Sequence, residues 1–224
     1  MLVNQPMTDY FLNIWYHITR RTEKGDELKL GDYTSIRTGL VFSRKEALPN
    51  DSNRRYRALN LRNVADNGQI LLSDIEDYYA SDALKKEYFT RDGDVLLRLS
   101  APYTAILITE EVDLLIPAHF AIIRTEKTLD PHYLHWWLMK NKKRFYQMAS
   151  GGTMMGTISS GYVADMTFEP PPIERQRQIA KLLELAKREQ QLLSMLAERK
   201  KQLIDAALKK ISSEKENSDY DHSK

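Results

Sequence analysis

Arginine and asparagine side chains gather in one short stretch of this sequence. Residues 53–63 contain four arginines, three asparagines and a tyrosine. Arginine can bind guanine through two parallel hydrogen bonds, asparagine can bind adenine in the same way, and both can bind phosphate oxygens. The stretch therefore predicts contact with a nucleic acid, with a solvated basic loop as the alternative. If residues 56–63 form a strand, Asn60 and Arg62 lie on its polar face, opposite Arg57. The candidates here are Arg54, Arg55, Tyr56, Arg57, Asn60, Arg62 and Asn63.

Three further groups of side chains are candidates for the same contact, and a plain structural role is the alternative for each. Two of them combine basic and hydroxyl side chains in turn-rich segments or just past a predicted strand. The third is a glycine-rich loop, in which the missing Cβ atoms let the backbone approach DNA closely. The groups are Arg37, Thr38, Arg44 and Lys45; Arg98, Ser100 and Tyr103; and Gly152 with Thr153.

Common catalytic patterns are missing from the sequence. It contains no cysteine, which excludes disulfides, thiolate zinc sites and cysteine nucleophiles. No glycine-rich loop has the form that binds a nucleotide phosphate, and the prolines at 170–172 precede Ile173 rather than the aromatic residue of an amino-methyltransferase motif. His132 and His135 lack an evident third metal ligand, and the Glu-Leu-Lys at 27–29 lacks the partner carboxylate of a nuclease. We therefore expect no metal site, no bound cofactor and no catalysis.

Charge is divided unevenly along an otherwise ordinary globular composition. The chain is 42% hydrophobic and 29% charged, with a net charge of +2. Residues 1–172 hold 21 Lys/Arg and 22 Asp/Glu, whereas residues 173–211 hold 10 and 5. DNA binding by the first segment must therefore rest on local clusters. No apolar run approaches the ~20 residues that span a bilayer, and no signal peptide is evident, so we expect a cytoplasmic protein without a membrane partner.

Turn signals and prolines predict short strands and a few helices within residues 1–172. Asp130 and Pro131 predict the N-cap and first residue of a helix that ends in residues 140–144. Apolar residues at helical spacing predict another helix over residues 8–21. Strands are predicted at Val95–Leu99, Ala105–Ile108 and Ala118–Ile123.

Residues 173–211 predict one long helix, because they contain neither proline nor glycine. At 1.5 Å per residue it would measure about 58 Å. Its apolar residues form two adjacent heptad stripes, which need more than one neighbouring surface to bury them. We therefore expect a second chain to cover part of the stripes. The alternative is that the helix folds back on its own domain. The polar residues 212–224 predict a disordered tail. The expected interface residues are Ile179, Leu182, Leu183, Ala186, Leu193, Leu196, Leu203 and Ile204.

The segment from Phe168 to Leu183 resembles the one that closes a target recognition domain in specificity subunits of type I restriction–modification systems. In that family a short strand leads into two prolines, an acidic residue and a glutamine, and an Ile-Ala pair opens a long helix. Arg175 is a departure, because the family usually has Glu directly before Gln. The match is carried by Pro171, Pro172, Glu174, Gln176, Ile179 and Ala180.

Further matches follow in the family's order, so that the resemblance covers roughly residues 28–211. They are Leu30-Gly31-Asp32, the turn and strand at 92–98, Pro131–Leu134, and Ala149–Thr153. The resemblance implies an α+β recognition domain with a mixed, twisted β-sheet and flanking helices, followed by a long helix in an intermolecular antiparallel coiled coil. A complete specificity subunit has two such domains and two such helices. Because this sequence has one of each, we expect a half-subunit that forms a homodimer.

The function implied by this resemblance is sequence-specific recognition of double-stranded DNA without catalysis. A symmetric dimer would read a bipartite, palindromic target. The implied partners are a methyltransferase subunit that uses S-adenosylmethionine and a restriction–translocase subunit. The main alternative is an interaction protein that no longer reads DNA and regulates the assembly of a full specificity subunit. An enzyme ranks third.

Overall fold

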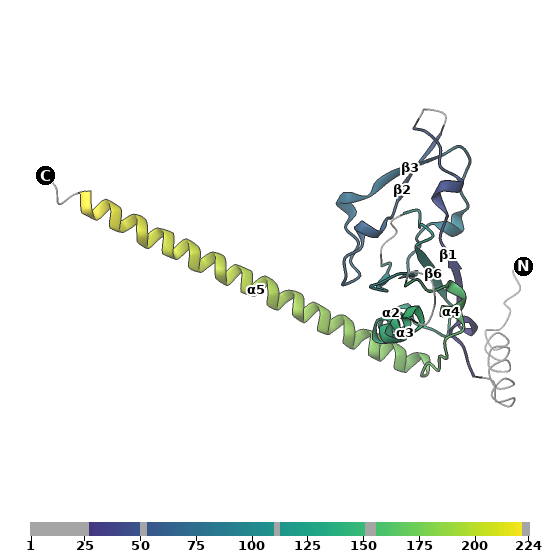
Figure 1. Ribbon diagram of the computed structural model, residues 1–224. Coiled ribbons are helices and arrows are strands. Elements are labelled where there is room, and N and C mark those ends of the chain that lie inside the picture. Colours follow the sequence, from purple (N-terminus) through teal and green to yellow (C-terminus); the bar gives the residue numbers. More distant parts are fainter. Residues whose placement is uncertain (1–26, 50–52, 110–112, 151–155, 221–224) are drawn as a thin grey trace, which may run out of the picture. The chain divides into compact units, whose positions relative to one another are not determined.

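The computed structural model describes residues 27–49, 53–109, 113–150 and 156–220 of the 224, with side chains described up to residue 210. The chain divides into two units, Met1–Arg177 and Gln178–Lys224. The first unit holds the sheets and short helices, and the second consists of most of one long helix (Figure 1). The helix predicted over residues 8–21 lies outside the described residues.

A four-stranded sheet forms the centre of the first unit, in the strand order β1-β6-β4-β5. Its two middle strands are short continuous apolar runs, the pattern of strands that are buried on both faces. Leu96, Leu97, Ile122 and Ile123 are all 0% exposed. The strands run over Thr34–Thr38 (β1), Val95–Arg98 (β4), Ala105–Leu107 (β5) and Phe120–Thr125 (β6). The three strands predicted from apolar runs are therefore confirmed, with ends shifted by up to two residues.

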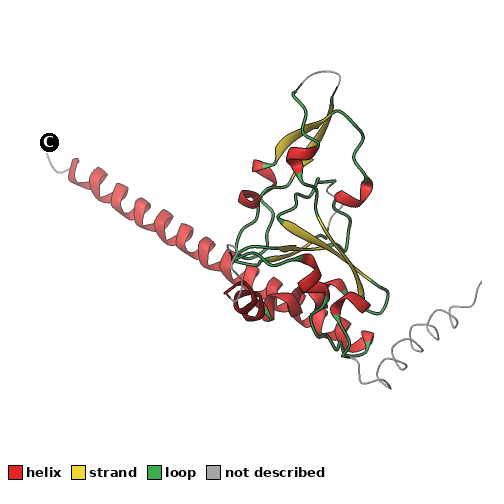
Figure 2. Cartoon of the chain, turned by 45° about the vertical axis from the view of Figure 1, so that its right-hand side comes forward, coloured by secondary structure: helices red, strands yellow, loops and turns green. Residues whose placement is uncertain are grey.

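A second sheet contains β2 (Arg54–Ala58) and β3 (Glu76–Ala80). Every strand pair of the two sheets is antiparallel among the described residues, and parallel pairing occurs only at isolated bridges such as Leu40 with Pro117. The α+β class is thus confirmed, whereas the sheet expected to be mixed is antiparallel. In Figures 1 and 2 the β2–β3 sheet and the helices α2 and α3 lie at opposite ends of this unit.

Helix α2 (Pro131–Lys140) begins where the sequence predicts. The Asp130 side chain accepts hydrogen bonds from the backbone N–H groups of the first turn, and proline occupies the first helical position. The helix stops at Asn141, whose side chain donates to the carbonyl of Trp137 at 2.8 Å. Helix α3 (Lys142–Ser150) starts directly afterwards, and α4 (Ser160–Ala164) packs in contact with β1. Residues 142–144 therefore begin a second helix instead of ending the first.

Helix α5 (Ile173–Tyr220) begins at the predicted residue, after the prolines at 170–172. It continues nine residues beyond the predicted end at Ile211, so most of the tail expected to be disordered is helical. The physical reason is that no proline or glycine follows to stop the helix.

Within the described part of the chain, none of the helices combines the length and the apolar character needed to cross a membrane.

Candidate nucleic-acid interface

The β2–β3 sheet has two chemically different faces. Tyr56 pairs with Tyr78 in the antiparallel register, and Ala58 and Ala80 lie on the same face by the alternation of a strand. This inner face packs against a core cluster that includes Leu40, Phe89 and Leu115. The apolar packing fixes which side chains of β2 remain for the solvent.

The outer face of this sheet presents arginines. Arg55 pairs with Tyr79 and Arg57 with Asp77, and all four point away from the inner face. Arg55 Nε lies 2.9 Å from Asp77 Oδ1, while 67% of the Arg55 side chain stays exposed. The hydrogen bond to Asp77 is the main reason why the pKa of the Arg55 guanidinium is raised above its ordinary value. Arg57 is exposed and has no side-chain polar partner among the described residues.

Three more predicted cations lie on or next to this sheet. Glu46 forms a bridge with Ala80 at the free edge of β3, which places Arg44 and Lys45 next to the sheet. Arg54 begins β2 and pairs with Ala80, so by the same alternation it lies on the side of Tyr56 and is exposed only at the end of the strand. All three cations are exposed and have no polar side-chain partner within the described ranges. We call the four exposed cations on the outer face or next to it the arginine face: Arg44, Lys45, Arg55 and Arg57.

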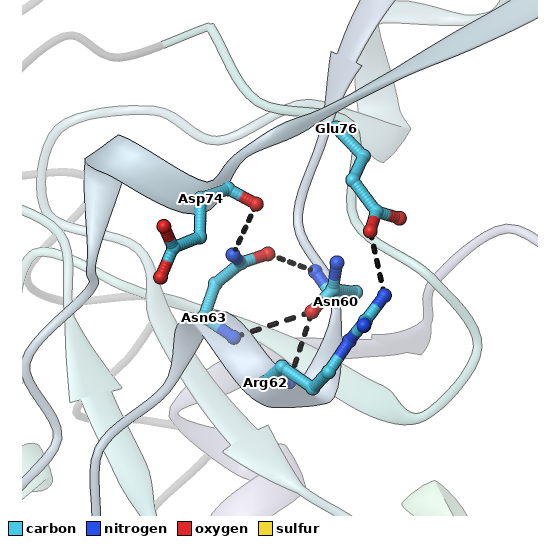
Figure 3. A network of polar contacts seen from close by, with 5 residues as sticks. All are labelled: Asn60, Arg62, Asn63, Asp74 and Glu76. Atoms are coloured by element: carbon cyan, nitrogen blue, oxygen red, sulfur yellow. Dashed lines mark hydrogen bonds and ion pairs between the residues drawn. The ribbon is translucent and has the colours of Figure 1, made fainter.

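The predicted strand over residues 56–63 is wrong beyond Ala58. Asn60 caps the 3-10 helix Leu61–Asn63 and accepts hydrogen bonds from Arg62 N at 2.9 Å and Asn63 N at 3.2 Å (Figure 3). The Asn63 side chain is 0% exposed, accepts a bond from Asn60 N and donates to the carbonyl of Asp74 at 2.8 Å. These two asparagines therefore hold the turn. Asn63 is buried and is corrected from a DNA contact to a structural residue, whereas Asn60 is half-buried and its contact with DNA stays a prediction.

Arg62 stays on the surface beside that turn. Its Nη2 lies 2.6 Å from Glu76 Oε1, with side chains 79% and 60% exposed. Because such exposed pairs are worth ~0–1 kcal/mol, a phosphate could compete for this arginine.

The two predicted tyrosines pack inward, and Tyr103 is corrected to a core residue. Tyr56 lies on the inner face, its ring centroid 5.4 Å from that of Phe89, and its hydroxyl accepts from Leu84 N. Tyr103 is 1% exposed, and its hydroxyl donates to the carbonyl of Gly156. In both residues the ring buries apolar surface while a backbone group bonds the hydroxyl. Tyr103 is thereby withdrawn from DNA, whereas Tyr56 is half-buried and its contact with DNA stays a prediction.

Most of the other candidates make bonds inside the first unit. Arg37 Nη1 lies 2.6 Å from Glu87 Oε2, and the Thr38 hydroxyl lies 3.0 Å from that of Ser160. The half-buried Arg98 donates to the Ser100 hydroxyl at 3.3 Å. The structure thus does not join these groups to the arginine face. Gly152 and Thr153 lie outside the described residues.

The interface predicted on the long helix consists of exposed apolar side chains. Leu182, Leu193, Leu196, Leu203 and Ile204 are between 58% and 71% exposed. Ala186 is exposed, whereas Ile179 and Leu183 are half-buried. A single helix cannot cover its own apolar stripe. Leu185 and Leu192, which belong to the predicted stripes, are exposed as well, and so are Met195 and Leu208, which the predicted stripes do not contain.

The two histidines considered as metal ligands have other partners. His132 Nδ1 lies 3.6 Å from the capping carboxylate of Asp130, and His135 Nε2 lies 3.2 Å from the carbonyl of Ala105. Within the described ranges, no three His, Asp or Glu side chains lie close enough together to hold a metal ion.

Comparison with known proteins finds likeness in fold. No family model and no curated protein matches the sequence. One solved structure that matches comes from a study of complex assembly and conformational transition in a type I R-M system, with a TM-score of 0.53 and 18% identity over 72% of this chain. Another is the HsdS subunit from Thermoanaerobacter tengcongensis, with a TM-score of 0.49 and 18% identity over 72% of this chain. This chain spans 38% and 37% of those chains.

Proposed function

We propose that this chain is a non-catalytic DNA-recognition component of a type I restriction–modification system. The observation that carries the proposal is the arginine face, whose exposed cations are mounted on a sheet that the core holds in place. The fold likeness to a chain of a type I R-M system supports the same function, as does the ordered set of motifs from Leu30-Gly31-Asp32 to Ile179-Ala180.

Within this proposal the two outer arginines have different tasks. Asp77 holds Nε of Arg55, so the terminal nitrogens of an already oriented guanidinium are left for a planar acceptor such as the O6/N7 edge of guanine. Arg57 has no such partner among the described residues and is suited to a phosphate. We expect Arg55→Ala to relax sequence preference at one base pair, and Arg57→Ala to weaken binding to all sequences alike.

We further propose that α5 pairs with the same helix of a second copy, antiparallel, and so joins two recognition units. The exposed apolar stripe around Leu193 and Leu196 supports this pairing. Two related units would read a bipartite, palindromic target. The methyltransferase subunit, with its S-adenosylmethionine, would then supply the chemistry in the cytoplasm, and a restriction–translocase subunit is the further partner.

The deciding experiment is genome-wide mapping of methylated bases with and without this gene. We expect one bipartite motif to disappear on deletion and to return with the wild-type gene. The Arg55→Ala gene should restore a degenerate form of the motif, whereas a gene carrying Arg188→Ala, which changes an exposed arginine of α5, should restore the original one. If deletion removes no motif, the recognition function is wrong.

The same exposed stripe on α5 also favours a second candidate, an interaction protein that regulates assembly of a full specificity subunit without reading DNA. The two candidates differ in one result. A regulator would alter methylation levels while Arg55→Ala and Arg57→Ala left every motif unchanged.

A further inference from the structure

A second concentration of positive charge lies at the junction of α2 and α3. Residues 131–164 contain four Lys/Arg and no Asp/Glu, whereas the rest of residues 1–172 contain 17 Lys/Arg and 22 Asp/Glu. All four cations fall within residues 140–144. The rest of this segment is acidic. No other run in the sequence has as many cations in so few residues without a carboxylate nearby in the chain.

Three of these four cations are exposed. Lys140 Nζ lies 5.3 Å from the ring centroid of Trp136, which holds its ammonium at the end of α2. Lys143 and Arg144 are exposed and have no polar side-chain partner among the described residues. Lys142 differs, because it is half-buried and desolvation lowers its pKa while Asp66 acts in the opposite direction. We therefore define the α2–α3 corner as Lys140, Lys143 and Arg144.

Three of the four charges are placed unfavourably for the helix that carries them, α3. Lys142, Lys143 and Arg144 form the first turn of α3, and that turn contains no acidic residue. The helix dipole disfavours cations at an N-terminus by ~0.3–1 kcal/mol each. A local rule that is broken without a structural gain is typical of functional positions.

One carboxylate that lines the same groove as Arg144 is already paired. Arg144 lines an open groove of about 490 Å³ between α3 and α4, together with Met148, Tyr162 and Asp165. Asp165 Oδ1 lies 2.8 Å from Lys29 Nζ, so its charge is largely balanced. Arg144 itself has no polar side-chain partner among the described residues, so it is available to an anion from the solvent.

We propose that the α2–α3 corner contacts the phosphate backbone of double-stranded DNA, as a second surface distinct from the arginine face. This inference rests on the proposed DNA-recognition function. Phosphate contacts position a protein on a duplex without carrying sequence information. The corner would thus set affinity and orientation, and the arginine face would set sequence.

The test uses the full chain with Lys143→Gln plus Arg144→Gln. The matched control is Lys187→Gln plus Arg188→Gln, an exposed Lys-Arg pair on α5 that lies outside the two leucine stripes and loses the same charge. Affinity is measured by fluorescence anisotropy from 50 to 200 mM salt. The probes are a duplex containing the methylated motif and a random duplex of equal length.

We expect the corner variant to lower the slope of log affinity against log salt by about 1.8, at ~0.9 for each phosphate that the variant no longer neutralises. Its affinity at 100 mM salt should fall about tenfold or more on both duplexes, so that the ratio between them stays unchanged. The control should change the slope by less than half as much. The corner variant should melt at or slightly above the wild-type temperature, because two cations leave the first turn of α3.

Several results would overturn the inference. An unchanged salt slope in the corner variant, or an equal loss of affinity in the control variant, excludes a specific DNA contact at the corner. The effect of Arg57→Ala on DNA affinity still tests the proposed function separately. Unchanged DNA affinity combined with loss of binding to the methyltransferase subunit would assign the corner to a protein partner. If the wild-type chain, alone or with that subunit, binds neither duplex, the proposed function and this inference both fail.

Discussion

Replacing Gln176 by alanine gives a direct test of how the first turn of α5 is anchored within the first unit. Gln176 is 0% exposed although glutamine is usually a surface residue. Its Oε1 accepts from Asp130 N at 2.8 Å, and its Nε2 donates to the carbonyls of Thr128 at 3.0 Å and Pro171 at 2.8 Å. One side chain thus connects the N-cap of α2, the loop before it and the prolines before α5.

The expected cost follows from those three bonds. A hydrogen bond contributes ~1 kcal/mol net, and a buried group left without a partner costs ~1–3 kcal/mol. Alanine returns a few tenths of a kcal/mol through its helix propensity. Water can reach some of the freed groups, so we expect Gln176→Ala to lower the free energy of unfolding by about 3 kcal/mol. For a unit of this size the melting temperature should fall by roughly 6–12 °C.

Chemical denaturation of the full chain, at one fixed protein concentration, measures this change. The control is Gln147→Ala, an exposed glutamine on α3, which should shift the free energy by less than ~0.5 kcal/mol. Gln176→Glu should lower the free energy of unfolding at pH 7 more than Gln176→Ala does, because an ionised carboxylate would face two carbonyl oxygens. That deficit should shrink as the pH falls, because protonation restores a donor and the introduced carboxyl has its pKa raised in the folded state. Equal stabilities of Gln176→Ala and Gln147→Ala would refute the reasoning.

Three other changes test separate parts of the structure. Arg124→Met should cost ~3–5 kcal/mol in denaturation, because Asp94, whose side chain is 3% exposed, loses a two-bond ion pair at 2.9 and 3.0 Å; a change below ~1 kcal/mol would contradict this. Leu193→Asp plus Leu196→Asp should convert a dimer to a monomer in sedimentation at micromolar concentration, and a wild-type monomer would refute pairing through α5. Gly68→Ala should destabilise by at least ~1 kcal/mol, since its φ is +82° and a Cβ would meet a backbone oxygen at 2.6 Å; an unchanged melting temperature would show that the turn relaxes freely.

Apolar runs and proline positions predict the central elements correctly because their signals are local. Strands β4 and β6 each contain a continuous apolar run, and a proline after an aspartate fixes the start of α2. The long α5 follows from the absence of helix breakers. In each case the residues that decide the element lie inside it or directly beside it, so a single sequence contains the needed information.

The candidate site is predictable in composition but not in geometry. The basic stretch is evident in the sequence, yet its strand ends at Ala58, because Asn60 and Asn63 bond to nearby backbone groups more favourably than a strand would allow. The pairing of Arg55 with Asp77 depends on the register of two segments 22 residues apart. Pattern reasoning does not supply that register, and it therefore places the polar face on the wrong residues of β2.

The two faces of the β2–β3 sheet separate folding from recognition. Tyr56 and Tyr78 hold the sheet through the core, whereas Arg55 and Arg57 project outward and take little part in that packing. Substitutions at exposed positions of this kind usually change stability by less than ~0.5 kcal/mol. Outer-face residues can therefore be exchanged, and base preference altered, while the inner face keeps the unit folded. On this reasoning, exchanges of Arg55 for Gln or Asn should change which motif is methylated while the melting temperature stays within a few degrees.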